Sequence, residues 1–459
     1  MLFSGLTFLY GFLPAVLALY FPAPKKLKNG VLLLASLFFY AWGEPRLAWL
    51  MLVTIGVFYL CGLAIGRAKS GKAKKAWLIA AATAGVGLLA VFKYADFFIG
   101  SFNAVTGLSI PLLRLTLPIG ISFYTFQCVS YAADVYRGDA APQRDLVSFG
   151  CYVALFPQLI AGPIVRYPQV ARELETRTHT AQDLTLGLRR FLFGLGKKVL
   201  LANQLGELTA LYRASDEKSV LFCWLYAAAF TLQIYFDFSG YSDMAIGLGR
   251  IFGFRFPENF DYPYLSRSVT EFWRRWHMTL GGWFRDYVYI PLGGSRVGRW
   301  RWLRNILIVW MLTGLWHGAS WNFVLWGMVF AALLILEKLA PGLARLPALP
   351  ARLYVMGAVT LSFVLFNAEG LGQAGQDLAG LFGLAGLPGV TAQSLYQLRS
   401  FAVLLLAGIL GATPWPKRWG EALLRRRPWL QTLAMIAMLL LCTACLVDGS
   451  FNPFLYFRF

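Results

Sequence analysis

The chain has 459 residues, of which 58% are hydrophobic and 14% are charged, and its mean hydropathy is +0.58. This composition excludes an ordinary soluble domain and predicts an all-α polytopic membrane protein. The formal net charge of +20 indicates basic loops that face anionic lipid. The same charge would attract an anionic donor such as a CoA thioester or an acidic carrier protein.

Apolar runs long enough to cross, or nearly cross, a bilayer recur along the chain. They are residues 6–21, 31–42, 47–65, 77–92, 115–133, 146–160, 186–202, 220–236, 303–315, 321–339, 354–366, 401–410 and 430–447. Several are shorter than the roughly 20 residues of a spanning helix, so they are expected to be tilted, re-entrant or buried in protein. We therefore expect about eleven transmembrane helices plus several partial ones.

The distribution of lysine and arginine predicts the orientation in the membrane. Basic clusters follow the first and third apolar runs, precede or overlap the start of the run at 303–315, follow the run at 321–339, and precede the last run. If these clusters are cytoplasmic, both termini lie on the extracytoplasmic side, including the aromatic tail at 448–459. The N-terminus has no charged segment before its apolar run, which favours a retained first span over a cleaved signal.

Three segments between the spans carry specific expectations. Residues 156–167 contain Pro157, Gly162 and Pro163, as a re-entrant element would. Residues 370–390 are rich in glycine and nearly uncharged, which favours an external loop. Asp237 and Asp243 lie close to apolar chain, where capping or pairing with arginine is favoured over catalysis.

Residues 266–326 contain two of the three histidines of the chain. Ser268 and Glu271 have capping-box spacing, which predicts the start of a helix that ends at Gly281 and Gly282. At about 100° per residue, His277 falls at the edge of an aromatic face of this helix. Two arginines, Arg274 and Arg275, fall on its other side, where they can reach headgroups, phosphates or solvent.

His317 interrupts an apolar segment, and an ionisable group in such a segment is a candidate functional residue because it is costly to keep there. The alternative is a packed histidine bonded to a neighbouring carbonyl group. The alternative for His277 is an interfacial anchor among tryptophans. Small residues around His317, including Gly314 and Gly318, suit either close helix packing or a ligand path.

Five segments of the chain resemble the membrane-bound O-acyltransferase family, most closely its bacterial branch of alginate O-acetylation proteins. They are LPIGISFYTFQCVSYAADVYRG (117–138), FPQLIAGPIVRY (156–167), DFSGYSDMAIGLGRIFGFRFPENFDYPY (237–264), EFWRRWHMTLGGWFRDYVYIPLGG (271–294) and LTGLWHGASWNFVLWG (312–327). The resemblance covers roughly the first three-quarters of the chain. It implies one integral-membrane domain over 1–459 in the bacterial cytoplasmic membrane. Its helices would ring a thin central floor pierced by a tunnel, with a catalytic core at 115–339.

The resemblance also implies the site. The two histidines of the family match His277 and His317, and the ending FLYFRF resembles a terminal tyrosine motif of cell-envelope acylation systems, which makes Tyr456 the implied acyl carrier. The implied donor is acetyl-CoA or another acyl thioester. The implied partners are an extracytoplasmic SGNH-type acyltransferase and the machinery of polysaccharide synthesis and export, within the lipid bilayer. No nucleic acid is expected.

Acyl transfer from a thioester to an oxygen needs a base for the hydroxyl proton and a group that stabilises the tetrahedral oxyanion. We expect the donor to dock near Arg274 and Arg275 and His317 to promote transfer, with His277 along the route. No permanently bound cofactor is expected, and a chain with three histidines and no acid–histidine cluster is not expected to bind metal.

Three other functions remain as alternatives. A channel or transporter would move substrate without covalent transfer, but no clear inverted repeat is seen. A processive glycosyltransferase would need a glutamine where Phe272 stands, five residues before His277, and a large soluble nucleotide-sugar domain. The third alternative is a non-catalytic scaffold of a polymer-export complex.

Overall fold

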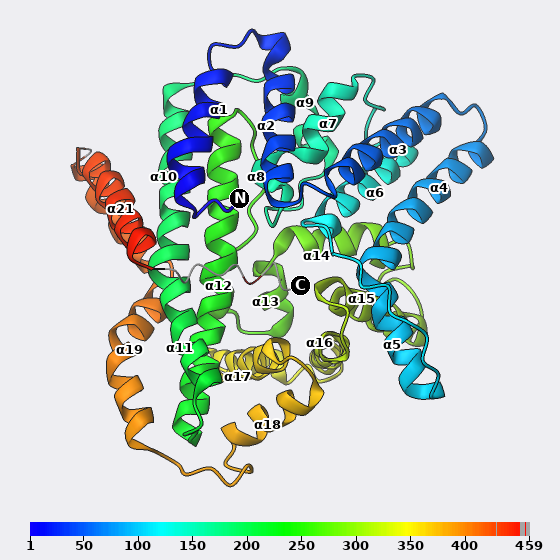
Figure 1. Ribbon diagram of the computed structural model, residues 1–459. Helices are drawn as coiled ribbons and strands as arrows, with labels where there is room; N and C mark the ends of the chain where they lie inside the picture. The colour runs from blue at the N-terminus through cyan, green and yellow to red at the C-terminus, as the bar shows by residue number, and fades with distance from the viewer. Residues whose placement is uncertain (428, 450–454, 456–459) are drawn as a thin grey trace. The chain divides into compact units, whose positions relative to one another are not determined.

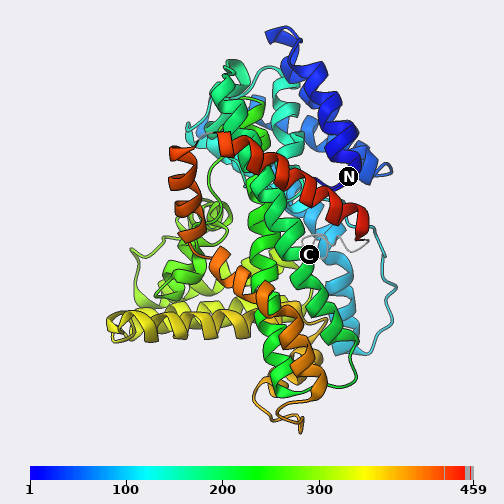
Figure 2. The ribbon, with the colours of Figure 1, turned by 90° about the vertical axis from the view of Figure 1, so that its left-hand side faces the viewer.

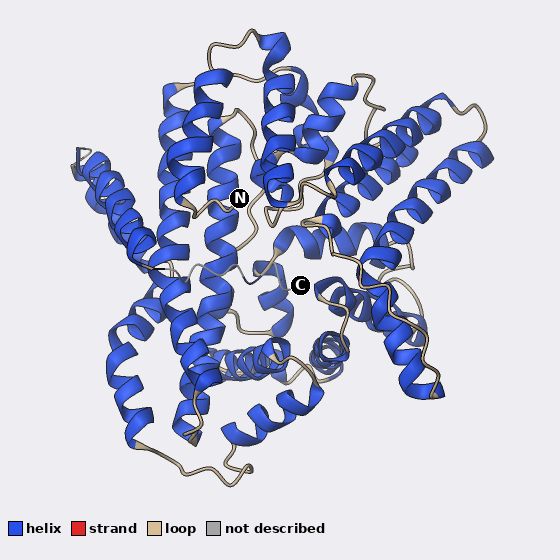
Figure 3. Ribbon diagram, in the orientation of Figure 1, coloured by secondary structure: helices blue, strands red, loops and turns tan. Residues whose placement is uncertain are grey.

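The computed structural model describes residues 1–427, 429–449 and 455 of the chain. All regular secondary structure in this described part is helical (Figures 1 and 3). The chain divides into two compact units, residues 1–191 with 242–257, and residues 192–241 with 258–459. Two helices, α10 (Ala181–Gly196) and α12 (Val220–Ile251), continue from one unit into the other.

The first unit is a set of packed helices with a cluster of phenylalanines. Its elements are η1 (Thr7–Phe12), α1 (Leu13–Tyr20), η2 (Lys25–Leu27), α2 (Lys28–Gly43), α3 (Ala48–Arg67), α4 (Gly71–Leu89), η3 (Ala90–Tyr94), α5 (Ala95–Thr106), α6 (Ile121–Arg137), α7 (Leu146–Ala154), α8 (Phe156–Leu159) and α9 (Tyr167–Glu175). Glycine allows α3 to approach α6 closely, since a Cβ atom at Gly62 would lie 2.5 Å from the Tyr131 ring.

The second unit contains both histidines of the 266–326 segment. Its elements are η4 (Lys197–Asn203), α11 (Gln204–Ala214), η5 (Pro263–Leu265), α13 (Val269–Arg275), α14 (Met278–Phe284), η6 (Arg285–Tyr289), α15 (Arg299–His317), α16 (Trp321–Leu339), η7 (Leu343–Arg345), α17 (Ala348–Asn367), α18 (Leu371–Leu381), α19 (Ala392–Gly411), α20 (Trp415–Arg426) and α21 (Trp429–Asp448). Figure 2 shows that α20 runs at a steep angle to both α19 and α21.

Helices α15 and α16 pack at the closest distance that glycine permits. A Cβ atom at Gly314 would lie 2.3 Å from the carbonyl oxygen of Phe323, and one at Gly327 would lie 2.2 Å from that of Trp310. Real Cβ atoms do not approach other atoms this closely, so both positions require glycine. This packing holds His317, the last residue of α15, against the start of α16.

Seven helices in the described part are long and apolar enough to cross a bilayer. They are Ala48–Arg67, Gly71–Thr106, Val220–Ile251, Trp321–Leu339, Ala348–Asn367, Ala392–Gly411 and Trp429–Asp448, and Thr7–Tyr20 is a shorter apolar helix. The all-helical class with several membrane spans is therefore confirmed. The expected total of about eleven spans stays a prediction.

Two local expectations were incomplete. The apolar run at 146–160 forms no single helix, since α7 ends at Ala154 and the short α8 begins at Phe156. The glycine-rich segment 370–390, expected to be a loop, contains α18. Two contacts stabilise this helix: the Asp377 carboxylate pairs with Arg213, and the indole N–H of Trp224 donates to the carbonyl group of Leu381.

Candidate active site

His277 lies between two short helices and not within one long helix. Ser268 is the N-cap as predicted, and its Oγ accepts the backbone N–H of Glu271 at 2.9 Å. However, α13 ends at Arg275, and His277 has the left-handed backbone angles φ 44° and ψ 52°. Gly281 and Gly282 lie inside α14 and do not end the helix. The predicted continuous helix was therefore wrong.

Asn259 explains this break through both its main chain and its side chain. Its backbone carbonyl group accepts the backbone N–H of Met278 at 3.0 Å, and its side-chain Oδ1 lies 3.1 Å from Nδ1 of His277. Oδ1 also accepts the backbone N–H and the hydroxyl of Thr279, at 3.3 and 2.9 Å. These bonds take over the polar groups that a continuous helix would have paired, because buried backbone groups need partners.

The same contacts determine the tautomer of His277. Because Oδ1 of Asn259 accepts from the N–H of Thr279, this atom is the amide oxygen and has no proton to donate. Nδ1 of His277 must therefore carry the proton in the bond to Asn259. The lone pair of the neutral imidazole then lies on Nε2, which can accept a proton or a hydrogen bond.

His317 ends α15 inside a wall of aromatic side chains. It is 4% exposed, and its ring centroid lies 4.9 Å from that of Trp316, 5.1 Å from that of Trp326 and 5.3 Å from that of Phe366. All three contacts are edge-on. These rings fix the imidazole in a dry environment, as a reaction that must exclude water would require.

The structure brings the two predicted histidines together around Trp316. The ring centroid of Trp316 also lies 5.8 Å from that of His277, and the ring centroid of Phe238 lies 4.6 Å from that of His277. Burial, with a further contribution from the charge that His317 can carry, holds the pKa of His277 well below its ordinary value. His277 is therefore a neutral imidazole at pH 7.

The two predicted donor-binding arginines differ in their surroundings. Arg274 is exposed, whereas Arg275 pairs with Glu271 at 2.8 Å. Arg275 also lines an open cavity of about 390 Å³. Other charged residues of its lining are Lys417, Arg418, Asp261 and Glu421. The cavity lining thus carries both signs of charge, with more cationic than anionic side chains. Arg275, which lines it, lies two residues before His277 in the sequence.

The two aspartates singled out in the sequence both form ion pairs. Asp243 pairs with Arg190 at 2.8 Å, as expected of an arginine partner. Asp237 pairs instead with a lysine, Lys198, at 2.5 Å, and both side chains are buried. The proposed acyl carrier Tyr456 lies outside the described residues, but the preceding Leu455 donates its backbone N–H to Oδ2 of Asp237 at 2.9 Å.

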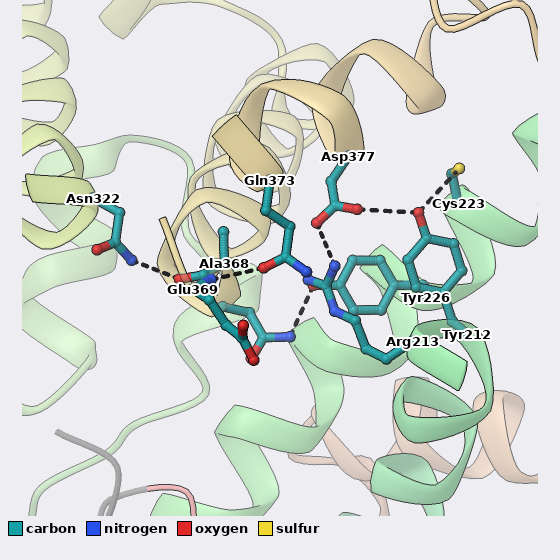
Figure 4. A network of polar contacts seen from close by, with 10 residues as sticks. Tyr212, Arg213, Cys223, Tyr226, Asn322, Ala368, Glu369, Gln373 and Asp377 are labelled. Carbon is teal, nitrogen blue, oxygen red and sulfur yellow. Dashed lines mark hydrogen bonds and ion pairs between the residues drawn. The ribbon is translucent and has the colours of Figure 1, made fainter. Parts of the chain in front are cut away.

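A polar network supports the Phe366 side of His317 (Figure 4). Nδ2 of Asn322 donates to the carbonyl group of Ala368 at 2.8 Å, which ties the start of α16 to the end of α17. The neighbouring Asn367 donates to the hydroxyl of Tyr226 at 2.8 Å. Tyr226 in turn accepts from Arg213, which pairs with Asp377 of α18 at 2.6 Å. The network therefore couples α11, α12, α16, α17 and α18.

Sequence reasoning missed the residues that position the histidines. Asn259 lies 18 residues before His277, and no periodic pattern links them. Phe238 and Trp316 lie just after two of the apolar runs, where nothing in the sequence distinguishes a residue that contacts a histidine from one that faces lipid. The segment PENFDYPY (257–264) stands out in the sequence only through the family resemblance. A polar residue among its aromatics was the one available signal for Asn259.

The sequence of this chain is similar to those of known membrane acyltransferases. Residues 140–371 match the membrane-bound O-acyltransferase family. The chain is 38% identical to the probable alginate O-acetylase AlgI of Azotobacter vinelandii, with all of both chains covered. It is 34% identical to the peptidoglycan O-acetyltransferase of Helicobacter pylori, over 84% of this chain and 81% of that protein.

A more distant relative is the teichoic acid D-alanyltransferase of Bacillus subtilis, at 29% identity over 47% of this chain and 58% of that protein. The family match over half of the chain and the relatives at 34–38% identity together identify the family of this chain.

The chain belongs to the membrane-bound O-acyltransferase family. It is a multi-pass membrane enzyme that transfers an acyl group from a donor substrate to an oxygen atom.

Proposed function

We propose that this O-acyltransferase moves an acetyl group from a cytoplasmic thioester, acetyl-CoA or another acyl donor, to the extracytoplasmic side for O-acetylation of an exopolysaccharide. His317 and His277 are the proposed catalytic residues. The observation that carries the proposal is that both imidazoles are buried and share contact with Trp316. The likeness to alginate O-acetylases at 38% identity supports an alginate-like polymer, with cellulose or another envelope glycan as the alternative acceptor.

The proposed chemistry follows from two buried imidazoles among aromatic side chains. His317 removes the proton of the acceptor hydroxyl as its oxygen attacks the thioester carbonyl carbon. The tetrahedral intermediate then collapses, the carbon–sulfur bond breaks, and the thiolate leaves with the proton that His317 returns. His277 lines the route along which the acceptor reaches His317. The aromatic wall excludes the water that would hydrolyse the donor.

The proposed route begins at the cationic surface near Arg274 and Arg275 and ends outside the membrane. The acceptor oxygen is that of Tyr456, a phenol that an adjacent base can activate, or of an outer acceptor directly. An SGNH-type extracytoplasmic acyltransferase would then place the acetyl group on the polymer made by the synthesis and export machinery. This route requires both termini outside and one domain over 1–459, with the core at 115–339 and helices that ring a thin floor with a tunnel.

Purified protein in lipid nanodiscs, incubated with radiolabelled acetyl-CoA, tests the transfer. We expect label on the wild-type chain, recovered on the peptide that contains Tyr456, and none on the Tyr456→Phe protein. In cells, normal polymer acetylation by Tyr456→Phe would contradict the relay but leave the histidine proposal in place. Substrate flux without any covalent transfer would instead support a transporter or an export scaffold.

A further inference from the structure

Leu455, four positions before the last residue of the sequence, is connected to the middle of α12 by a buried carboxylate. Leu455 is 6% exposed, belongs to the same apolar core as Tyr235 and Phe236, and donates its backbone N–H to Oδ2 of Asp237 at 2.9 Å. The two partners are 218 residues apart in the sequence. A hydrogen bond from a main-chain N–H to a carboxylate is charge-assisted. Because every residue except proline has this N–H, the bond holds the main chain in place whatever the side chain at that position.

Lys198 pairs with this carboxylate and orients it. Its Nζ lies 2.5 Å from Oδ1 of Asp237, and the two side chains are 3% and 2% exposed. The close approach of the backbones makes the pair possible, since a Cβ atom at Gly240 would lie 2.7 Å from the carbonyl oxygen of Gly194. A buried ion pair is often no more stabilising than apolar residues of the same volume. Stability alone therefore does not account for it.

The turn of α12 that contains Asp237 also contacts the histidine pair. Phe238, the next residue, lies with its ring centroid 4.6 Å from that of His277, in an edge-on contact. Tyr235, half a turn earlier, contacts Trp276 at 6.2 Å. The same helical turn thus binds Leu455 through its carboxylate and contacts His277 through its neighbouring ring.

We propose that the Asp237–Lys198 pair is an anchor that positions the C-terminal segment, holding Leu455 at the turn of α12 that contacts His277. Tyr456 directly follows the anchored residue in the sequence. The anchor therefore limits how far this tyrosine can move from the catalytic site. Its importance for catalysis rests on the proposed acyl relay through Tyr456, whereas its existence as an anchor does not.

The test uses full-length protein with Phe457→Cys as a reporter and Cys445→Ser to remove the one half-exposed cysteine; the other five are buried. Leu455→Pro deletes the N–H donor and leaves the ion pair intact. Leu455→Val is the matched control, because it keeps both the donor and an apolar side chain. The double variant Asp237→Asn/Lys198→Gln removes the charge of the acceptor in this hydrogen bond. Because both members of the ion pair are replaced, no buried ion is left unpaired.

We expect the rate of maleimide labelling at the reporter to rise about tenfold or more in Leu455→Pro and in the double variant, as loss of a hydrogen bond to a charged group predicts. Leu455→Val should label like the starting protein. Equal labelling of all four proteins would overturn the anchor. Because labelling requires no acyl transfer, it decides the anchor even if Tyr456→Phe shows that there is no relay.

Polymer acetylation, measured in the same Leu455→Pro and Leu455→Val variants without the reporter cysteine, tests the positioning role. If the relay operates, acetylation should fall about tenfold in Leu455→Pro, in proportion to the loss of the anchored state, and stay near normal in Leu455→Val. Faster labelling with normal acetylation in Leu455→Pro would overturn a role of the anchor in positioning the tail for transfer.

Discussion

Asn259 determines which nitrogen of His277 carries the proton. Its Oδ1 lies 3.1 Å from Nδ1 and also accepts both donors of Thr279, so the lone pair of the imidazole lies on Nε2. Removing this acceptor in Asn259→Ala should release the ring and lower kcat by about tenfold or more, since the imidazole proposed to line the acceptor route is no longer oriented. Initial rates of acyl transfer with labelled donor provide the measurement.

Asn259→Asp should change the pH dependence and not the geometry. In the wild type, burial lowers the pKa of His277, so kcat/KM should remain high as the pH falls below about 6.5. A carboxylate at 259 would favour the imidazolium ion and raise this pKa, so the acid limb of the profile should move to higher pH. An unchanged acid limb would contradict the assignment of His277 to the titrating site.

The lowered pKa of His277 also makes the stability of the folded protein depend on pH, which limits the pH range in which rates can be compared. Below about 6.5 the unfolded chain binds a proton at His277 while the folded chain does not, so the free energy of unfolding falls as the pH falls. Thermal unfolding should therefore be measured at each pH value of the profile. This control separates loss of folded protein from protonation of the site.

His317→Ala should reduce acetylation by about 100-fold or more while the protein remains in the membrane, since it removes the proposed base. His179→Gln is the matched control. His179 is the third histidine and belongs to the first unit, where its Nε2 lies 2.9 Å from the hydroxyl of Tyr20. Glutamine can keep this bond, so activity should remain normal. Acetylation retained by His317→Ala would exclude its catalytic role.

Gly327→Ala should disturb the contact between α15 and α16 that holds His317. The new Cβ atom would lie 2.2 Å from the carbonyl oxygen of Trp310, so the helices must separate at a cost of about 1–3 kcal/mol. Gly357→Ala, on α17, meets no atom within 4 Å and should be neutral or stabilising by about 0.5–1 kcal/mol. Melting temperatures and transfer rates measure both, and equal effects would contradict the packing argument.

Arg275→Ala and Arg274→Ala should raise KM for the donor with little change in kcat, because they remove attraction that the ground state and the transition state share. The effect should weaken at high salt. Arg399→Ala removes an exposed charge of the same sign on α19 and serves as the control. If all three variants raise KM equally, the attraction comes from the net charge of the protein and not from this surface.

The composition and the apolar runs of this chain were enough to predict an all-helical membrane protein, because a bilayer leaves the backbone few other ways to pair its polar groups. Ser268 as an N-cap and the pairing of Asp243 with arginine were also predictable, since both depend on local rules. The proposal that His317 is catalytic came from its place in an apolar segment, and it stays a prediction.

Only the tertiary structure decided how the histidines are held. The break at His277 arises because Asn259, distant in sequence, competes for the polar groups that a continuous helix would pair. Lys198 replaced the expected arginine as the partner of Asp237 because glycine at 240 lets two helices approach there. Such contacts depend on side chains that meet across the fold, and helical periodicity records only which face each residue occupies along its own helix.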